Sequence, residues 1–186
     1  MKEEGKTPMV REALVPLVTD DKASSDLKEQ YGHVAAAMGR VPHLARVIAN
    51  CESLFGPFMG LAGAVAMEHT VPMNLKSLAV LRASELNGCG YCKGMHGPIL
   101  KSLGVSDQKI EGVLQKDIQA DLFSEKERLV LQLTDEMTEN VAASPAVVKR
   151  ARQTFGDDGA VELMMTIAFY NLMNRMAESS GVPLEE

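Results

Sequence analysis

Two cysteines and one histidine lie close together near the middle of the chain: Cys89, Cys92 and His96. Their spacing is i, i+3 and i+7, so on a helix that begins near residues 87–88 all three side chains would point the same way. A Cys-X-X-Cys pair at a helix start is a place where a thiol pKa is readily lowered, which makes the sulfur a nucleophile. We therefore predict a reactive pair that cycles between dithiol and disulfide, with His96 taking or returning a proton.

Two other uses of these residues stay open. Free cysteines are often simply buried as small hydrophobic side chains. A Cys2His zinc site would need a fourth ligand, for which the chain offers Glu85 or one of three distant histidines: His33, His43 and His69. We expect neither a metal nor a cofactor.

Length and composition favour one compact domain. The chain has 186 residues, 46% of them hydrophobic, with a formal charge of −6 and no basic cluster, so nucleic-acid and membrane binding are not expected. Residues 1–22 read as an N-terminal arm and 23–186 as the domain. The first residues lack the apolar segment of a signal peptide, which indicates the cytoplasm. In that reducing compartment the third cysteine, Cys51, is expected to be buried.

Apolar periodicity and capping residues predict an all-α, multi-helix bundle. Asn74 is expected to cap the helix that leads to the cysteines, and Ser124 with Glu127 has the form of a capping box. The last helix is apolar around most of its surface, so it should lie centrally or at a subunit interface. The expected helices are 24–39, 42–53, 55–67, 75–86, 88–104, 106–114, one from 124, 145–155 and 159–177.

The segment 75–92, with His96 behind it, resembles the signature of the carboxymuconolactone decarboxylase-like superfamily, and most closely its alkyl hydroperoxidase D branch. Residues 39–44, the Ser124 capping box and residues 169–175 are also typical of that branch. The resemblance extends over the chain from about residue 13.

This resemblance implies an all-helical protein that forms homo-oligomers, commonly trimers or hexamers, and acts as a thiol-dependent peroxidase. Cys92, next to His96, would attack a small hydroperoxide and become a sulfenic acid, which Cys89 would resolve as a disulfide. A dithiol reductant, such as a lipoylated or thioredoxin-like protein, would restore the pair.

One position departs from the family pattern. The family has a glutamate on the preceding helix that relays protons to the histidine, and the matching residue here is Ser77. A serine hydroxyl does not take up a proton near neutral pH, so the relay is either weakened or supplied by another group. Glu85 is one candidate for the role, and the pair Glu68–His69 is another.

Two other functions remain possible from the sequence. A carboxymuconolactone decarboxylase-like lyase would use His96 as its acid or base and would not need the cysteines. A non-enzymatic oligomer would use the Cys-X-X-Cys pair as a redox sensor or as part of a zinc site.

Overall fold

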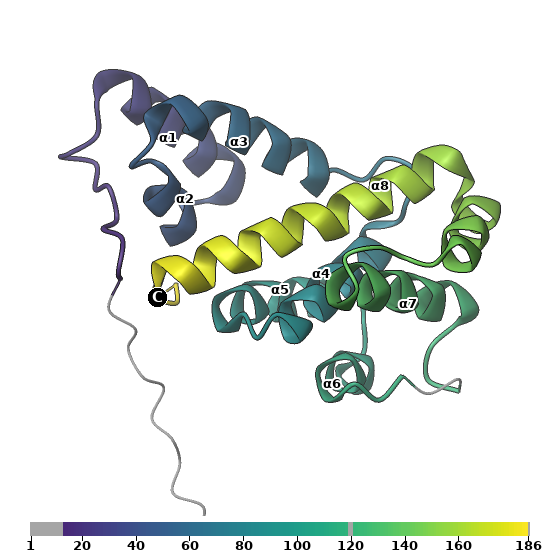
Figure 1. Ribbon diagram of the computed structural model, residues 1–186. Helices are drawn as coiled ribbons and strands as arrows, with labels where there is room; N and C mark the ends of the chain where they lie inside the picture. Colours follow the sequence, from purple (N-terminus) through teal and green to yellow (C-terminus); the bar gives the residue numbers. More distant parts are fainter. Residues whose placement is uncertain (1–12, 119–120, 186) are drawn as a thin grey trace, which may run out of the picture.

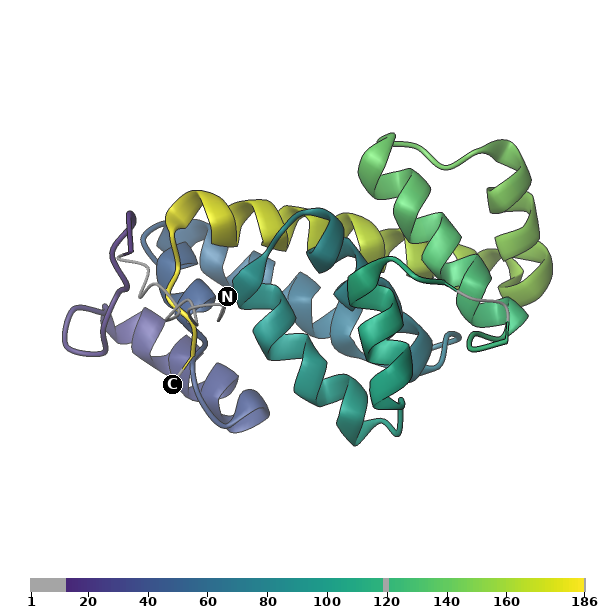
Figure 2. The same ribbon diagram turned by 90° about the horizontal axis from the view of Figure 1, so that it is seen from below.

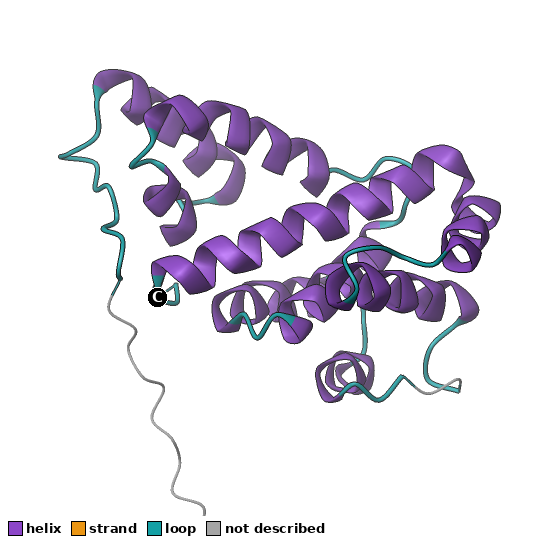
Figure 3. Ribbon diagram, viewed as in Figure 1, coloured by secondary structure: helices purple, strands orange, loops and turns teal. Residues whose placement is uncertain are grey.

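The computed structural model describes residues 13–118 and 121–185, and all regular structure within them is helical (Figure 3). This confirms the all-α expectation. None of the described helices is long and apolar enough to cross a membrane. The helices are α1 (Ser25–Met38), α2 (His43–Ile48), α3 (Glu52–Ala66), α4 (Met73–Leu86), α5 (Gly90–Ser102), α6 (Asp107–Gln115), α7 (Glu125–Glu139) and α8 (Pro145–Ser180).

Helix α8 runs along the middle of the molecule, with α1–α3 on one side and α4, α5 and α7 on the other (Figures 1 and 2). Buried hydrophobic side chains form two clusters around it. One cluster joins α4, α6 and α7 to α8. The other joins α1–α3 to the last turns of α8, and it includes Cys89, Tyr91 and Cys92. The cysteine pair thus lies in an apolar core, where charges are poorly solvated.

Helix α8 comprises the two last helices expected from the sequence. They join at Gly156, whose φ of 75° and ψ of 176° are not helical. Only glycine adopts this backbone conformation readily, so the chain turns there without a clash. The part after Gly156 is the long central rod in Figure 1.

Two expectations about single residues were wrong. Asn74 does not cap α4, because the helix begins at Met73, two residues before the expected start. The Glu68 carboxylate accepts the Met73 backbone N–H at 2.7 Å. Cys51 is exposed rather than buried, since it precedes α3, a helix with few buried side chains. The capping box of Ser124 and Glu127 at the start of α7 is confirmed.

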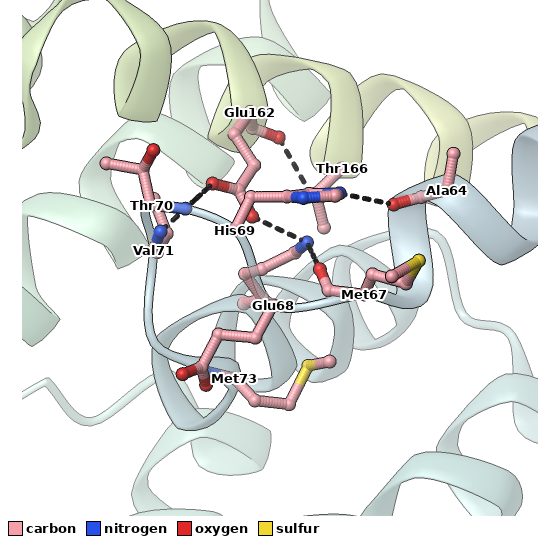
Figure 4. A network of polar contacts seen from close by, with 10 residues as sticks. Ala64, Met67, Glu68, His69, Thr70, Val71, Met73, Glu162 and Thr166 are labelled. Carbon is pink, nitrogen blue, oxygen red and sulfur yellow. Dashed lines mark hydrogen bonds and ion pairs between the residues drawn. The ribbon is translucent and has the colours of Figure 1, made fainter.

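A buried ion pair fastens the α3–α4 connection to α8. Lys76 Nζ lies 2.8 Å from Glu162 Oε1 and donates to the Met67 carbonyl at 2.6 Å. The other oxygen of Glu162 accepts the backbone N–H groups of Thr70 and Val71, both at 2.9 Å (Figure 4). Every charge in this network is thereby compensated, as burial requires.

The expected arm, residues 1–22, is described only from residue 13. Leu14 and Val15 donate backbone hydrogen bonds to the Ser180 carbonyl at the end of α8, at 2.9 and 3.2 Å. Val18 donates to the Arg46 carbonyl at 3.1 Å. These contacts hold the start of the described chain against α2 and the end of α8.

Candidate active site

Cys89 is the residue that caps the N-terminus of α5. Its backbone is extended, with φ −75° and ψ 97°, and its sulfur accepts the backbone N–H of Cys92 at 3.2 Å. Gly88, with φ 67°, turns the chain from α4 into this cap. Both thiols are free and buried, Cys89 at 0% and Cys92 at 3% exposure. Cys89 and Cys92 thus lie at the N-terminal end of one helix, joined by this hydrogen bond.

The two thiols interact through a hydrogen bond that shifts their pKa values in opposite directions. A hydrogen bond from the Cys92 thiol lowers the pKa of Cys89, and the Cys92 N–H adds to this, against burial and the nearby Glu178 carboxylate. The same thiol–thiol bond, together with burial and the charge of Cys89, raises the pKa of Cys92. In the reduced pair the first thiolate therefore belongs to Cys89, although the resemblance expects Cys92 to be the attacking sulfur.

A carboxylate from α8 contacts this pair, and this contact was not predicted from the sequence. Glu178 Oε1 accepts the Gly90 backbone N–H at 3.1 Å. The same carboxylate accepts a hydrogen bond from the Cys89 thiol, and its charge acts on both sulfurs. The nearest sequence signal is its spacing, four residues after Asn174 and eight after Tyr170, which places all three on one face of α8.

His96 is on the second turn of α5 and is half-buried. Its ring packs edge-on against Tyr170, with ring centroids 4.9 Å apart. Burial lowers the pKa of His96 to about 4 and raises that of Tyr170 to about 12, so both are neutral at pH 7. Among the described residues, His96 forms no hydrogen bond with either sulfur.

The same face of α8 carries an unsatisfied amide between Tyr170 and Glu178. Asn174 is fully buried and its Oδ1 accepts a hydrogen bond from Ser84 at 3.3 Å. Its Nδ2 has no hydrogen-bond partner among the described residues. A buried donor without an acceptor is costly, so this amide is available to a polar ligand or a water.

Within the part of the chain that the structure describes, none of the candidate relay residues is hydrogen-bonded to His96. Ser77 is buried on α4. Glu85 pairs with Lys93 at 2.8 Å, at a partly exposed position between α4 and α5. Glu68 holds the start of α4, and His69 Nε2 contacts the Ala64 carbonyl at 3.1 Å, so this pair stabilises the α3–α4 connection (Figure 4). Glu85, Glu68 and His69 thus have structural partners of their own.

A cavity of about 610 Å³ borders α1 and α2. Glu185 lines this cavity. Its carboxylate accepts hydrogen bonds from the His43 backbone N–H at 2.7 Å and from the Tyr91 hydroxyl at 2.5 Å. Tyr91 stands between the two cysteines in the sequence, so this cavity adjoins the segment that carries them. In the described ranges, no group of three or more His, Cys, Asp or Glu side chains is arranged to hold a metal ion.

Comparisons with known proteins agree with this architecture. Residues 53–136 match the model of the Carboxymuconolactone decarboxylase family. The uncharacterized protein YdfG of Bacillus subtilis is 24% identical over 116 residues, which are 61% of this chain and 78% of that protein. The segment matched by the family model includes Cys89, Cys92 and His96.

Solved structures share the fold over nearly the whole chain. The alkylhydroperoxidase AhpD core protein of Ralstonia eutropha JMP134, described as peroxidase-related, superposes with a TM-score of 0.79 at 21% identity, covering 94% of this chain and 93% of that one. A variant of the debrominase Bmp8, solved with 2,3,4-tribromopyrrole, gives a TM-score of 0.77 at 19% identity, covering 94% and 93%. At these identities the likeness concerns the fold.

Proposed function

Since the chain belongs to the carboxymuconolactone decarboxylase-like superfamily, in which peroxidase-related and decarboxylase-like proteins share one fold, we propose that it is a thiol-dependent peroxidase or disulfide reductase. The observation that carries the proposal is the sulfur pair at the start of α5. The Cys92 N–H and the Cys92 thiol both stabilise negative charge on Cys89, so one proton of the pair leaves easily. An ionised thiol is the nucleophile that hydroperoxide reduction needs.

In the proposed reaction, Cys92 attacks the distal oxygen of a hydroperoxide while its proton passes to Cys89 along the thiol–thiol hydrogen bond. The O–O bond breaks, the alkoxide leaves as an alcohol after taking a proton from solvent, and Cys92 becomes a sulfenic acid. Cys89 then attacks the Cys92 sulfur, and the sulfenic oxygen leaves as water. The two thiols lose two electrons, and the hydroperoxide gains them.

His96 follows Cys92 by one turn, on the side of α5 that faces Tyr170. Because the pKa of His96 is about 4, the ring is neutral at pH 7. A neutral imidazole can accept or donate a hydrogen bond, but it does not act as a cationic general acid. Its proposed role is to orient the peroxide, or a water that bridges it to Cys92.

A dithiol reductant would complete the cycle. One thiolate of a lipoylated or thioredoxin-like partner attacks the Cys89–Cys92 disulfide, and its second thiol displaces the mixed disulfide. A dithiol suits this site because both sulfurs are buried, so that an intramolecular second step releases the partner without another encounter.

Exposed apolar side chains support the proposed homo-oligomer. They lie on α3 and α8, where a second copy would cover them. These exposed apolar residues are Leu54, Leu61, Val161, Met165, Leu172 and Met176. Light scattering coupled to size-exclusion chromatography would detect a trimer or hexamer, and a monomer would refute this part of the proposal.

The function is tested by following peroxide consumption with dihydrolipoamide as the electron donor. We expect Cys92→Ser and Cys89→Ser to lose activity. Cys51→Ser should be as active as the parent, because Cys51 is exposed and lies outside the site. Peroxide turnover that survives the loss of both Cys89 and Cys92 would refute the thiol-dependent mechanism.

A further inference from the structure

The proposed dithiol reaction needs a group that takes the proton of Cys89. The structure brings a carboxylate of α8 to the sulfur pair. Glu178 lies near the end of α8, accepts the Gly90 N–H at 3.1 Å and accepts a hydrogen bond from the Cys89 thiol. Its position beside the sulfur is thus fixed by a backbone contact.

We propose that Glu178 is the catalytic base that accepts the proton of Cys89. This inference rests on the proposed function. The thiol proton moves from Cys89 to the Glu178 carboxylate, the Cys89 sulfur attacks Cys92, and the S–O bond of the sulfenic acid breaks. The leaving hydroxide takes the proton back from Glu178, so one water forms and the carboxylate is restored.

The base is needed at this step because of what oxidation removes. In the reduced pair, the largest contribution that lowers the pKa of Cys89 is the hydrogen bond from the Cys92 thiol. That thiol no longer exists once Cys92 is a sulfenic acid. Burial of Cys89 then favours the protonated form, against the single N–H of Cys92. A proton acceptor in contact with the Cys89 thiol removes this obstacle.

A merely electrostatic carboxylate predicts the opposite effect on rate. The charge of Glu178 raises the pKa of both sulfurs, so its removal alone would make thiolates easier to form. The variant Glu178→Gln keeps an oxygen for the Gly90 N–H but does not accept a proton. If Glu178 is a base, this variant is slower, and if it acts only through its charge, it is as fast or faster.

The experiment follows a single turnover in a Cys51→Ser background, which leaves Cys89 and Cys92 as the thiols. The reduced protein is mixed with one equivalent of tert-butyl hydroperoxide, quenched at intervals with dimedone and analysed by intact mass. In the parent we expect disulfide without trapped sulfenic acid. In Glu178→Gln we expect sulfenic acid to accumulate at pH 7 and the disulfide to form at least about tenfold more slowly.

The pH profile separates a base from a structural role. The deficit of Glu178→Gln should shrink above about pH 9, where solvent hydroxide deprotonates Cys89. Glu178→Asp, a shorter carboxylate, should recover part of the rate at pH 7. Glu29→Gln changes an exposed carboxylate on α1 and should match the parent. Circular dichroism shows whether each variant keeps its helices.

Two different failures can be told apart. If the parent forms no disulfide with peroxide, the proposed function is wrong, and this inference falls with it. If the parent forms the disulfide and Glu178→Gln forms it equally fast or faster from pH 6 to 9, only the role of Glu178 is wrong. A deficit that is the same at every pH would also overturn the base, since it indicates misplacement of Gly90 rather than a missing proton acceptor.

Discussion

Replacing Lys76 by methionine should destabilise the protein markedly. The Lys76 side chain is 2% exposed and that of Glu162 is 11% exposed, so methionine would leave the carboxylate without its cation in a place that water barely reaches. Breaking a buried ion pair from one side costs about 3–5 kcal/mol. Glu162 keeps its two hydrogen bonds from Thr70 and Val71, which compensate part of its charge, so we expect the low end, about 3 kcal/mol.

For a chain of this length, about 3 kcal/mol corresponds to a fall in Tm of roughly 6–12 °C. Thermal and urea unfolding, followed by circular dichroism, measure this directly. The matched control is Lys101→Met, which breaks a pair of similar length to Asp107, 2.7 Å, but between side chains that are 60% and 78% exposed. Exposed pairs contribute about 0–1 kcal/mol, so this variant should unfold almost as the parent does.

The pH dependence provides a second check. Burial alone would raise the pKa of Glu162, but the hydrogen bonds from Lys76, Val71 and Thr70 outweigh it, so the pKa lies below the ordinary 4.5. A lowered carboxyl pKa stabilises the fold above pH 4.5, and this contribution is lost as the pH falls below that value. Lys76→Met should weaken that loss. Equal effects of Lys76→Met and Lys101→Met on Tm would refute the reasoning.

Three further predictions concern single residues. Under native conditions, one thiol of three, the exposed Cys51, should react rapidly with an aromatic disulfide reagent, and Cys51→Ser should abolish the fast phase; three equally fast thiols would contradict the burial of the pair. The ring of His96 should titrate in NMR spectra with a midpoint near pH 4, and a midpoint near 6.5 would mean that the ring is solvated. Gly156→Ala forces a side chain into a glycine-only conformation and should cost about 1–3 kcal/mol in urea unfolding, whereas an unchanged midpoint would disprove the strain.

The helices were predictable because their signals are local. The capping box at Ser124 and the glycine at position 156 mark their elements within a few residues, whatever the rest of the chain does. The start of α4 was missed because its first N–H is held by Glu68, five residues away, rather than by a side chain at the usual capping position. The exposure of Cys51 was not predicted, because the sequence does not show how few side chains of α3 are buried by the rest of the molecule.

The site was only half predictable for a similar reason. Cys89, Cys92 and His96 are close in sequence, and their spacing was enough to place them on one helix. Glu178 comes from an element almost ninety positions later, and its contact with Gly90 depends on how α8 packs against α5. Nothing in a stretch that reads as an apolar packing helix distinguishes that glutamate from a solvent-exposed one.

The capping role of the Cys89 sulfur also bears on the electron affinity of the pair. The Cys92 N–H and the Cys92 thiol stabilise the Cys89 thiolate, and so the reduced form of the pair. In the oxidised form this thiolate is absent, because its sulfur is part of the disulfide. Each 1.4 kcal/mol of such stabilisation raises the reduction potential of a dithiol couple by about 30 mV. The first turn of α5 therefore influences the midpoint potential of the pair. Substitutions in that turn would change which reductants can reduce its disulfide.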